Sequence, residues 1–178
     1  MKIIREKDKK KKSIEQICNE SIMPKLYSID NNSFVLWEGR ETFISSLIES
    51  VENNKLMYLY GKWHRGIGKS SFIANLSKEY DIPIITTSRM QKKLFVNELH
   101  VPENKVFFMH NEEYSNDTKY RRNEFNKFAD NENRMYALVD LWGAQGGHFK
   151  MINKYFDEND IKGTLLGFVS DDVQYRLK

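Results

Sequence analysis

Residues 55–76 read KLMYLYGKWHRGIGKSSFIANL, so that an apolar run leads into a glycine-rich basic loop and then into a helix-like segment. The run Leu56–Tyr60 is short and continuous, which predicts a buried strand of a parallel sheet. Gly66 and Gly68 let the backbone N–H groups turn toward a polyphosphate, whose close approach a Cβ would block. The segment therefore predicts a phosphate-binding loop between a strand and a helix, and a plain glycine-rich turn is the alternative.

Side chains at the end of this loop are suited to contact a bound nucleotide. Lys69 would reach the β- and γ-phosphates, and Ser70 would offer its hydroxyl to Mg²⁺. The following helix would direct the partial positive charge of its N-terminus at the same anion. The spacing fits G-x-x-x-x-G-K-[ST] if Trp63 and His64 are an insertion. The expected nucleotide contacts are Gly61, Arg65, Gly66, Ile67, Gly68, Lys69, Ser70 and Ser71.

The composition favours a single globular domain. The chain has 178 residues, of which 40% are hydrophobic, enough for one sizeable core. We expect a basic flexible tail over residues 1–12 and one domain over 13–178, beginning with a helical extension at Ser13–Ile22. No apolar segment is long enough to span a membrane or to form a signal peptide. The sequence therefore predicts no membrane partner and a cytoplasmic location, or the host cytoplasm if the protein is viral.

Strand-like and helix-like segments alternate after the loop, which predicts a three-layer α/β fold with a mainly parallel sheet and helices on both faces. Further strands are expected at 82–87, 105–109, 135–140 and 163–170, and a charged surface helix at Thr118–Asn131. Ligands bind at the carboxyl ends of such strands. Three polar groups fall there: Thr86–Arg89, Asp140 and Ser170. Ser170 would lie near the γ-phosphate if the last strand lies beside the first.

Asp140 ends the apolar strand Met135–Asp140, as the aspartate of a Walker B strand does, and would help to hold Mg²⁺. The next two residues are Leu141 and Trp142, whereas many ATPases have a glutamate directly after this aspartate as the base that activates water. Hydrolysis by that route is therefore in doubt. Other side chains that could activate or orient water are Glu112, Glu113 and Gln145.

Two basic blocks, Lys9–Lys12 and Lys119–Arg122, could contact the phosphates of a nucleic acid. The net charge of the whole chain is only +3, which does not by itself indicate such a partner. For each block, a solvated tail or helix face is the alternative.

The order of these elements resembles that of the P-loop NTPases. The core Arg65–Ser70, RGIGKS, is similar to the loop of viral DNA-packaging ATPases and of AAA-type ATPases. Gly39-Arg40-Glu41, before the next helix, resembles the adenine-side element of AAA-type ATPases. The resemblance implies ATP and Mg²⁺ as cofactors, with Lys69 and Asp140 in catalysis. In such an ATPase, Arg89, Arg121 or Arg122 could act as an arginine finger, within the chain or across the interface of a homo-oligomer.

The expected function is that of an ATP-hydrolysing motor or switch that acts on nucleic acid, in packaging or a replication-like process. A small nucleotide or nucleoside kinase is an alternative, in which Lys119–Arg122 would form a lid over the transferred phosphate. A nucleotide-dependent interaction protein with little turnover is a third reading, because no glutamate follows Asp140.

Overall fold

The computed structural model describes residues 11–28, 33–60, 66–109, 121–142 and 146–171. The helices are α2 (Ile14–Ser21), α3 (Arg40–Glu52), α4 (Lys69–Tyr80), α5 (Arg89–Lys93), the π-helical turn η2 (Leu94–Glu98), the 3₁₀ turn η3 (Glu103–Lys105), α7 (Arg122–Asn126) and α8 (Gly146–Glu158). The strands are β1 (Lys25–Ser28), β2 (Ser33–Leu36), β3 (Leu56–Tyr60), β4 (Ile84–Thr86), β5 (Val106–Phe108), β6 (Arg134–Trp142) and β7 (Lys162–Asp171).

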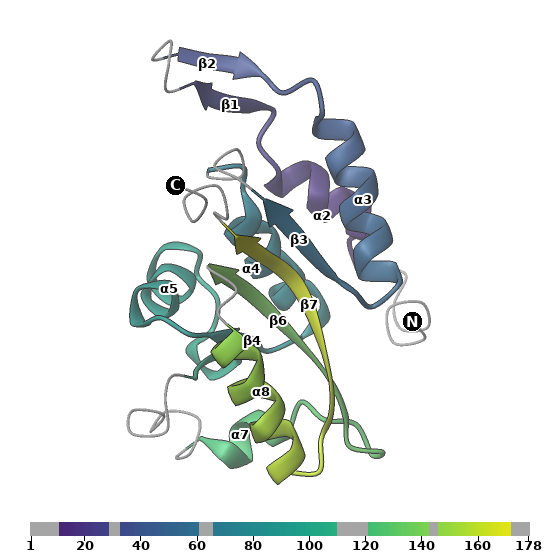
Figure 1. Ribbon diagram of the computed structural model, residues 1–178, viewed down its shortest axis with the longest axis vertical. Coiled ribbons are helices and arrows are strands. Elements are labelled where there is room, and N and C mark those ends of the chain that lie inside the picture. The colour runs from purple at the N-terminus through teal and green to yellow at the C-terminus, as the bar shows by residue number, and fades with distance from the viewer. Residues whose placement is uncertain (1–10, 29–32, 61–65, 110–120, 143–145, 172–178) are drawn as a thin grey trace.

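Five strands form one parallel sheet in the order β3-β7-β6-β4-β5 (Figure 1). The predicted α/β fold with a parallel sheet is therefore confirmed. The strand β7 lies directly beside β3, with Ser170 opposite Leu59. The last strand is therefore next to the strand that precedes the loop, which is the arrangement that would bring Ser170 near a bound phosphate. The strand β6 comes next, which places Asp140 two strands away from β3.

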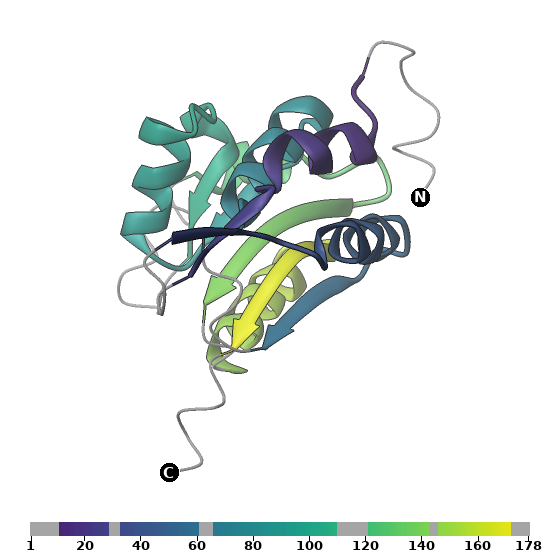
Figure 2. The same ribbon diagram turned by 90° about the horizontal axis from the view of Figure 1, so that it is seen from above.

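Helices cover both faces of the sheet and give it two hydrophobic cores. Figure 2 shows α2 and α4 on one side of the sheet and α8 on the other. Alternate residues of each strand point to opposite faces. Accordingly, Ile84, Val106, Leu138 and Leu166 join the core under α2, α3 and α4, while Ile85, Phe107 and Val139 join the core under α7 and α8. All these side chains are fully buried, as expected for parallel strands.

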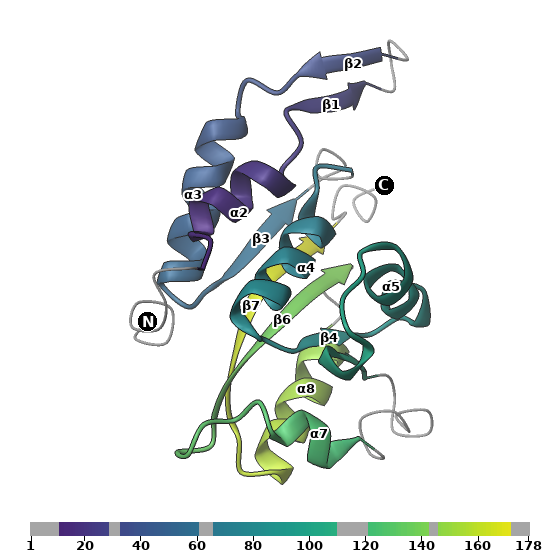
Figure 3. The same ribbon diagram turned by 180° about the vertical axis from the view of Figure 1, so that it is seen from behind.

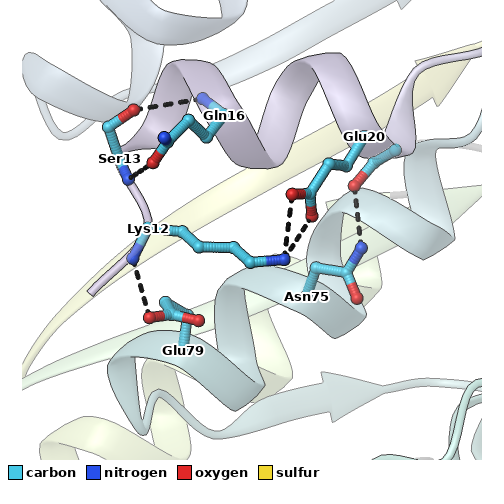
Figure 4. A network of polar contacts seen from close by, with 7 residues as sticks. Lys12, Ser13, Gln16, Glu20, Asn75 and Glu79 are labelled. Carbon is cyan, nitrogen blue, oxygen red and sulfur yellow. Dashed lines mark hydrogen bonds and ion pairs between the residues drawn. The ribbon is translucent and has the colours of Figure 1, made fainter. Parts of the chain in front are cut away.

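The helix α2 begins with a capping box, in which Ser13 and Gln16 each bond the backbone N–H of the other. Figure 4 shows how Lys12, just before it, joins α2 to α4. Its ammonium contacts Glu20 at 2.6 Å, and its backbone N–H donates to Glu79. Lys12 therefore belongs to the folded part of the chain, whereas the predicted boundary places it in the tail.

The strands β1 and β2 form a two-stranded antiparallel hairpin between α2 and α3. The strand β2 overlaps the apolar run Phe34–Trp37, which by itself predicts a short strand or extended segment. Figures 1 and 3 show the hairpin beyond the carboxyl edge of the five-stranded sheet, the edge toward which β3, β6 and β7 point.

The charged surface helix predicted for Thr118–Asn131 is shorter than expected. Within the described residues it spans only Arg122–Asn126, as α7. Phe125 is fully buried and meets Phe107 edge-to-face, with ring centroids 4.8 Å apart. This aromatic contact holds the apolar side of α7 against the sheet, while Arg122, Asn123 and Glu124 are exposed, as expected of a charged helix on the surface.

No helix in the described part of the chain is long and apolar enough to cross a lipid bilayer.

Candidate functional site

The described end of the glycine-rich loop, residues 66–70, leads from β3 into α4. Gly66 and Gly68 have φ angles of +71° and +96°, values that side-chain-bearing residues rarely adopt. The helix α4 begins directly afterwards, and Phe72 N–H donates to Gly68 O at 2.9 Å. No side chain of the described residues caps this helix. The N–H groups of its first turn therefore remain available to an anion.

Ser70 and Asp140 meet at this helix terminus although they are 70 residues apart in the chain. Ser70 Oγ donates a hydrogen bond to Asp140 Oδ2 at 2.7 Å. The carboxylate comes from the end of β6, and the hydroxyl comes from the first turn of α4, which crosses over the sheet from β3. Hydroxyl and carboxylate oxygens are hard ligands of the kind that Mg²⁺ prefers. The pair brought together here is thus the one predicted to hold Mg²⁺.

Lys69 and Asp140 are both largely removed from solvent, with 8% and 9% of their surfaces exposed. Burial raises the pKa of the Asp140 carboxyl above its ordinary value of 3.8, while the Ser70 hydrogen bond and the positive charge of Lys69 oppose this change. Fixed charges in a buried site interact more strongly than charges in water. The site therefore combines the cation of Lys69 with the carboxylate of Asp140, whose ionised form destabilises the folded protein because it is buried.

We expect Asp140→Asn to stabilise the protein at neutral pH. Because the folded-state pKa of Asp140 is raised, the folded protein binds more protons than the unfolded chain just above pH 3.8, and stability falls as pH rises through that range. Asparagine keeps the shape and can accept the Ser70 hydrogen bond, but carries no charge. Urea unfolding of both proteins from pH 4 to pH 8 should show an advantage for Asp140→Asn that grows with pH. An advantage independent of pH would contradict this account.

Ser170 adds an unsatisfied polar group to the same edge of the sheet. It lies two residues after Phe168, whose ring packs against Phe72 of α4, so its side chain faces the α4 layer. The residue is 6% exposed, and its Oγ has no hydrogen-bond partner among the described residues. A buried hydroxyl without a partner is unfavourable, so its position near the helix terminus is consistent with a polar ligand.

The segment Ser21–Met23, at the end of α2, supports the glycine-rich loop from behind. Met23 N–H donates to Ile67 O at 3.0 Å, and Ile67 is fully buried. Gly68 lies so close to this segment that a Cβ there would be 2.0 Å from Ser21 O. Gly68 therefore has a second role beyond its backbone angle, which is to allow α2 to approach the loop.

Arg40 fixes the end of α2. Its guanidinium donates to the carbonyl oxygens of Asn19 and Ile22, at 3.2 Å and 3.0 Å, as well as to the Asn19 side chain. These carbonyls lie at the helix C-terminus, where a cation is favourable. The sequence of the Gly39-Arg40-Glu41 element does not predict this role for Arg40.

Two other predicted cations, Arg89 and Arg121, lie in different surroundings. Arg89 begins α5, near the carboxyl end of β4, and is exposed. Arg121 donates to the carbonyl oxygens of Glu103 and Val106 and lies 4.6 Å from the centroid of the Phe107 ring, on the opposite face of the sheet from α4. Arg121 is therefore committed to packing and is not placed to act at this site within the chain.

Several predicted residues fall outside the described residues, and the structure does not test them. These are Gly61, Arg65, Lys9, Lys10, Glu112, Glu113, Lys119, Tyr120 and Gln145. Ser71 lies in the first turn of α4, one residue beyond Ser70, where its backbone N–H belongs to the uncapped group.

Comparison with known proteins gave no match for this chain among protein-family models, curated proteins or solved structures.

Proposed function

We propose that this protein is a P-loop NTPase that binds ATP and Mg²⁺ at the N-terminus of α4. The observation that carries the proposal is the hydrogen bond of 2.7 Å between Ser70 and Asp140. This bond joins the hydroxyl of Ser70, directly after Lys69 on α4, to the carboxylate of Asp140 on β6. A magnesium nucleotide site of this class requires such a hydroxyl and such a carboxylate side by side.

The residues would divide the work as follows. Lys69 and the N–H groups of the first turn of α4 would bind the β- and γ-phosphates. Ser70 and Asp140 would hold Mg²⁺, which neutralises charge on the phosphates when bound. Ser170, whose hydroxyl lacks a partner among the described residues, would donate to an oxygen of the terminal phosphate.

The narrower proposal is an ATPase motor or switch on nucleic acid. Exposed Arg89 is available to the site of a neighbouring subunit, where an arginine would stabilise the transition state. Support from the basic blocks is weaker, because Lys12 binds Glu20 and Arg121 binds backbone carbonyls of its own chain. The position of Arg121 on the opposite face also removes support for a kinase lid built from Lys119–Arg122.

The test is Mg²⁺-dependent ATP binding and phosphate release, measured for the protein alone, with DNA or RNA, and with nucleosides and nucleoside monophosphates. We expect Ser70→Ala to weaken the Mg²⁺-dependent part of ATP affinity by about tenfold or more. Ser46→Ala, the same chemical change at an exposed position of α3, is the matched control. Equal ATP affinity in the parent and in Ser70→Ala, with and without Mg²⁺, would refute the metal assignment.

The molecule that receives the terminal phosphate of ATP, water or a nucleoside, distinguishes the functional classes. Phosphate release stimulated by nucleic acid would support the motor or switch, and transfer to a nucleoside or monophosphate would indicate a kinase. Tight ATP binding without turnover under any condition would indicate a nucleotide-gated interaction protein. No binding of any nucleotide would refute the proposal as a whole.

A further inference from the structure

On its β4 side, Asp140 of β6 is held by a side chain that neither the loop nor the strand pattern indicates, while on the other side β6 stays paired with β7 as far as Trp142. The ladder between β4 and β6 pairs Ile84 with Leu138 and Ile85 with Val139, and it stops there. Asp140 is the next residue of β6. Its backbone carbonyl accepts a hydrogen bond from Gln91 Nε2, on α5. Gln91 thus continues, with a side-chain amide, the support that β4 gives to the preceding residues.

The position of Gln91 is itself fixed by the contacts of α5. Ser88 Oγ accepts a hydrogen bond from Met90 N–H at 3.2 Å and so caps the start of this helix. On the other side of Gln91, Lys92 forms an ion pair of 3.3 Å with Glu103. Gln91 is half-buried between these anchors. Its amide therefore reaches Asp140 from a helix that is held at both neighbouring positions.

We propose that Gln91 is a positioning residue for Asp140, an inference that rests on the proposed function. Its amide fixes the backbone of Asp140, which keeps the carboxylate directed at Ser70. Loss of this donor removes the hydrogen bond that Gln91 gives to the Asp140 carbonyl, so that residues 140–142 of β6 are held by β7 and no longer by α5. Substitution of a group that orients a metal-binding side chain typically lowers metal affinity, while the other contacts to the ligand stay in place.

The first test is magnesium-dependent ATP binding by Gln91→Met, which keeps the length and loses the donor. We expect ATP affinity in the presence of Mg²⁺ to fall by about tenfold and affinity in excess EDTA to stay unchanged, because Lys69 and the loop are intact. Lys93→Met, at an exposed position of the same helix, is the control and should match the parent in both conditions. A parallel loss with and without Mg²⁺ would mean that Gln91 has a merely structural role and would overturn the proposal.

The second test needs no nucleotide and so separates this proposal from the proposed function. Amide hydrogen exchange of the unliganded protein should be faster at Leu141 and Trp142 in Gln91→Met than in Lys93→Met. Gln91→Glu, which replaces the donor by an acceptor, should show the same change. Unchanged exchange at the end of β6 in both variants would overturn the positioning role. Failure of the parent to bind ATP would instead refute the proposed function and leave the exchange result standing.

Discussion

Lys69→Met is expected to weaken the binding of ATP with Mg²⁺ by about 100-fold or more. A hydrogen bond to a charged group contributes about 1.5–3 kcal/mol, and 1.4 kcal/mol corresponds to a factor of ten in affinity. Lys69 would make more than one such contact with the phosphates, from a position that is only 8% exposed. Methionine keeps the apolar stem in this buried position, so the change chiefly removes the cation.

The measurement is titration calorimetry of ATP with Mg²⁺, with Lys78→Met as the matched control. Lys78 is exposed near the other end of α4, where its ammonium donates to Leu99 O at 3.2 Å. The control should bind ATP as the parent does. If Lys69→Met binds ATP with unchanged affinity, the loop is not a phosphate-binding loop.

Gly68→Ala is expected to destabilise the protein by about 2–5 kcal/mol and to abolish nucleotide binding. A side chain in the left-handed region costs about 1–2 kcal/mol, and overpacking against fixed atoms adds about 1–3 kcal/mol. The new Cβ would lie 2.0 Å from the carbonyl oxygen of Ser21, which is backbone and is held in place by α2. Either α2 or the loop must therefore move.

Gly66→Ala separates the two contributions to this effect. Gly66 also has a positive φ, of +71°, but a Cβ there would meet no atom within 4 Å. We expect the free energy of unfolding of this variant, measured in urea, to fall only by the cost of the backbone conformation, about 1–2 kcal/mol. Hydrogen exchange at Met23, whose N–H donates to Ile67 O, should accelerate in Gly68→Ala and much less in Gly66→Ala. Equal losses of stability in the two variants would show that the contact with Ser21 is unimportant.

The parts of the fold that depend on local pattern were predictable from the sequence. The continuous apolar run Leu56–Tyr60 is the strand β3, and Asp140 meets Ser70 at the start of α4, although β6 continues two residues beyond the predicted end, to Trp142. Local patterns sufficed because parallel strands buried on both faces must be apolar throughout. The sequence does not predict the hydrogen bond between Ser70 and Asp140 directly. It predicts only that the two side chains lie close together, because both are expected to hold the same Mg²⁺.

The remaining parts depend on contacts between distant segments, which a local pattern does not encode. A run of cations does not reveal that Arg121 turns toward carbonyl groups and an aromatic ring while Arg122 stays exposed. Similarly, nothing near Gln91 indicates that β4 ends its pairing one residue before Asp140. The role of Arg40 depends on where α2 ends, some 20 residues earlier in the chain.

The contact between α2 and the loop means that the site is built from both sides of the hairpin β1–β2. Ser21 and Met23 precede the hairpin, Arg40 follows it, and together they form the base on which Gly68 rests. A substitution in this base would act on nucleotide affinity without touching the nucleotide. By the same linkage, a bound nucleotide would stabilise α2 in its position against the loop. The stability of the beginning of the chain would then depend on whether nucleotide is bound.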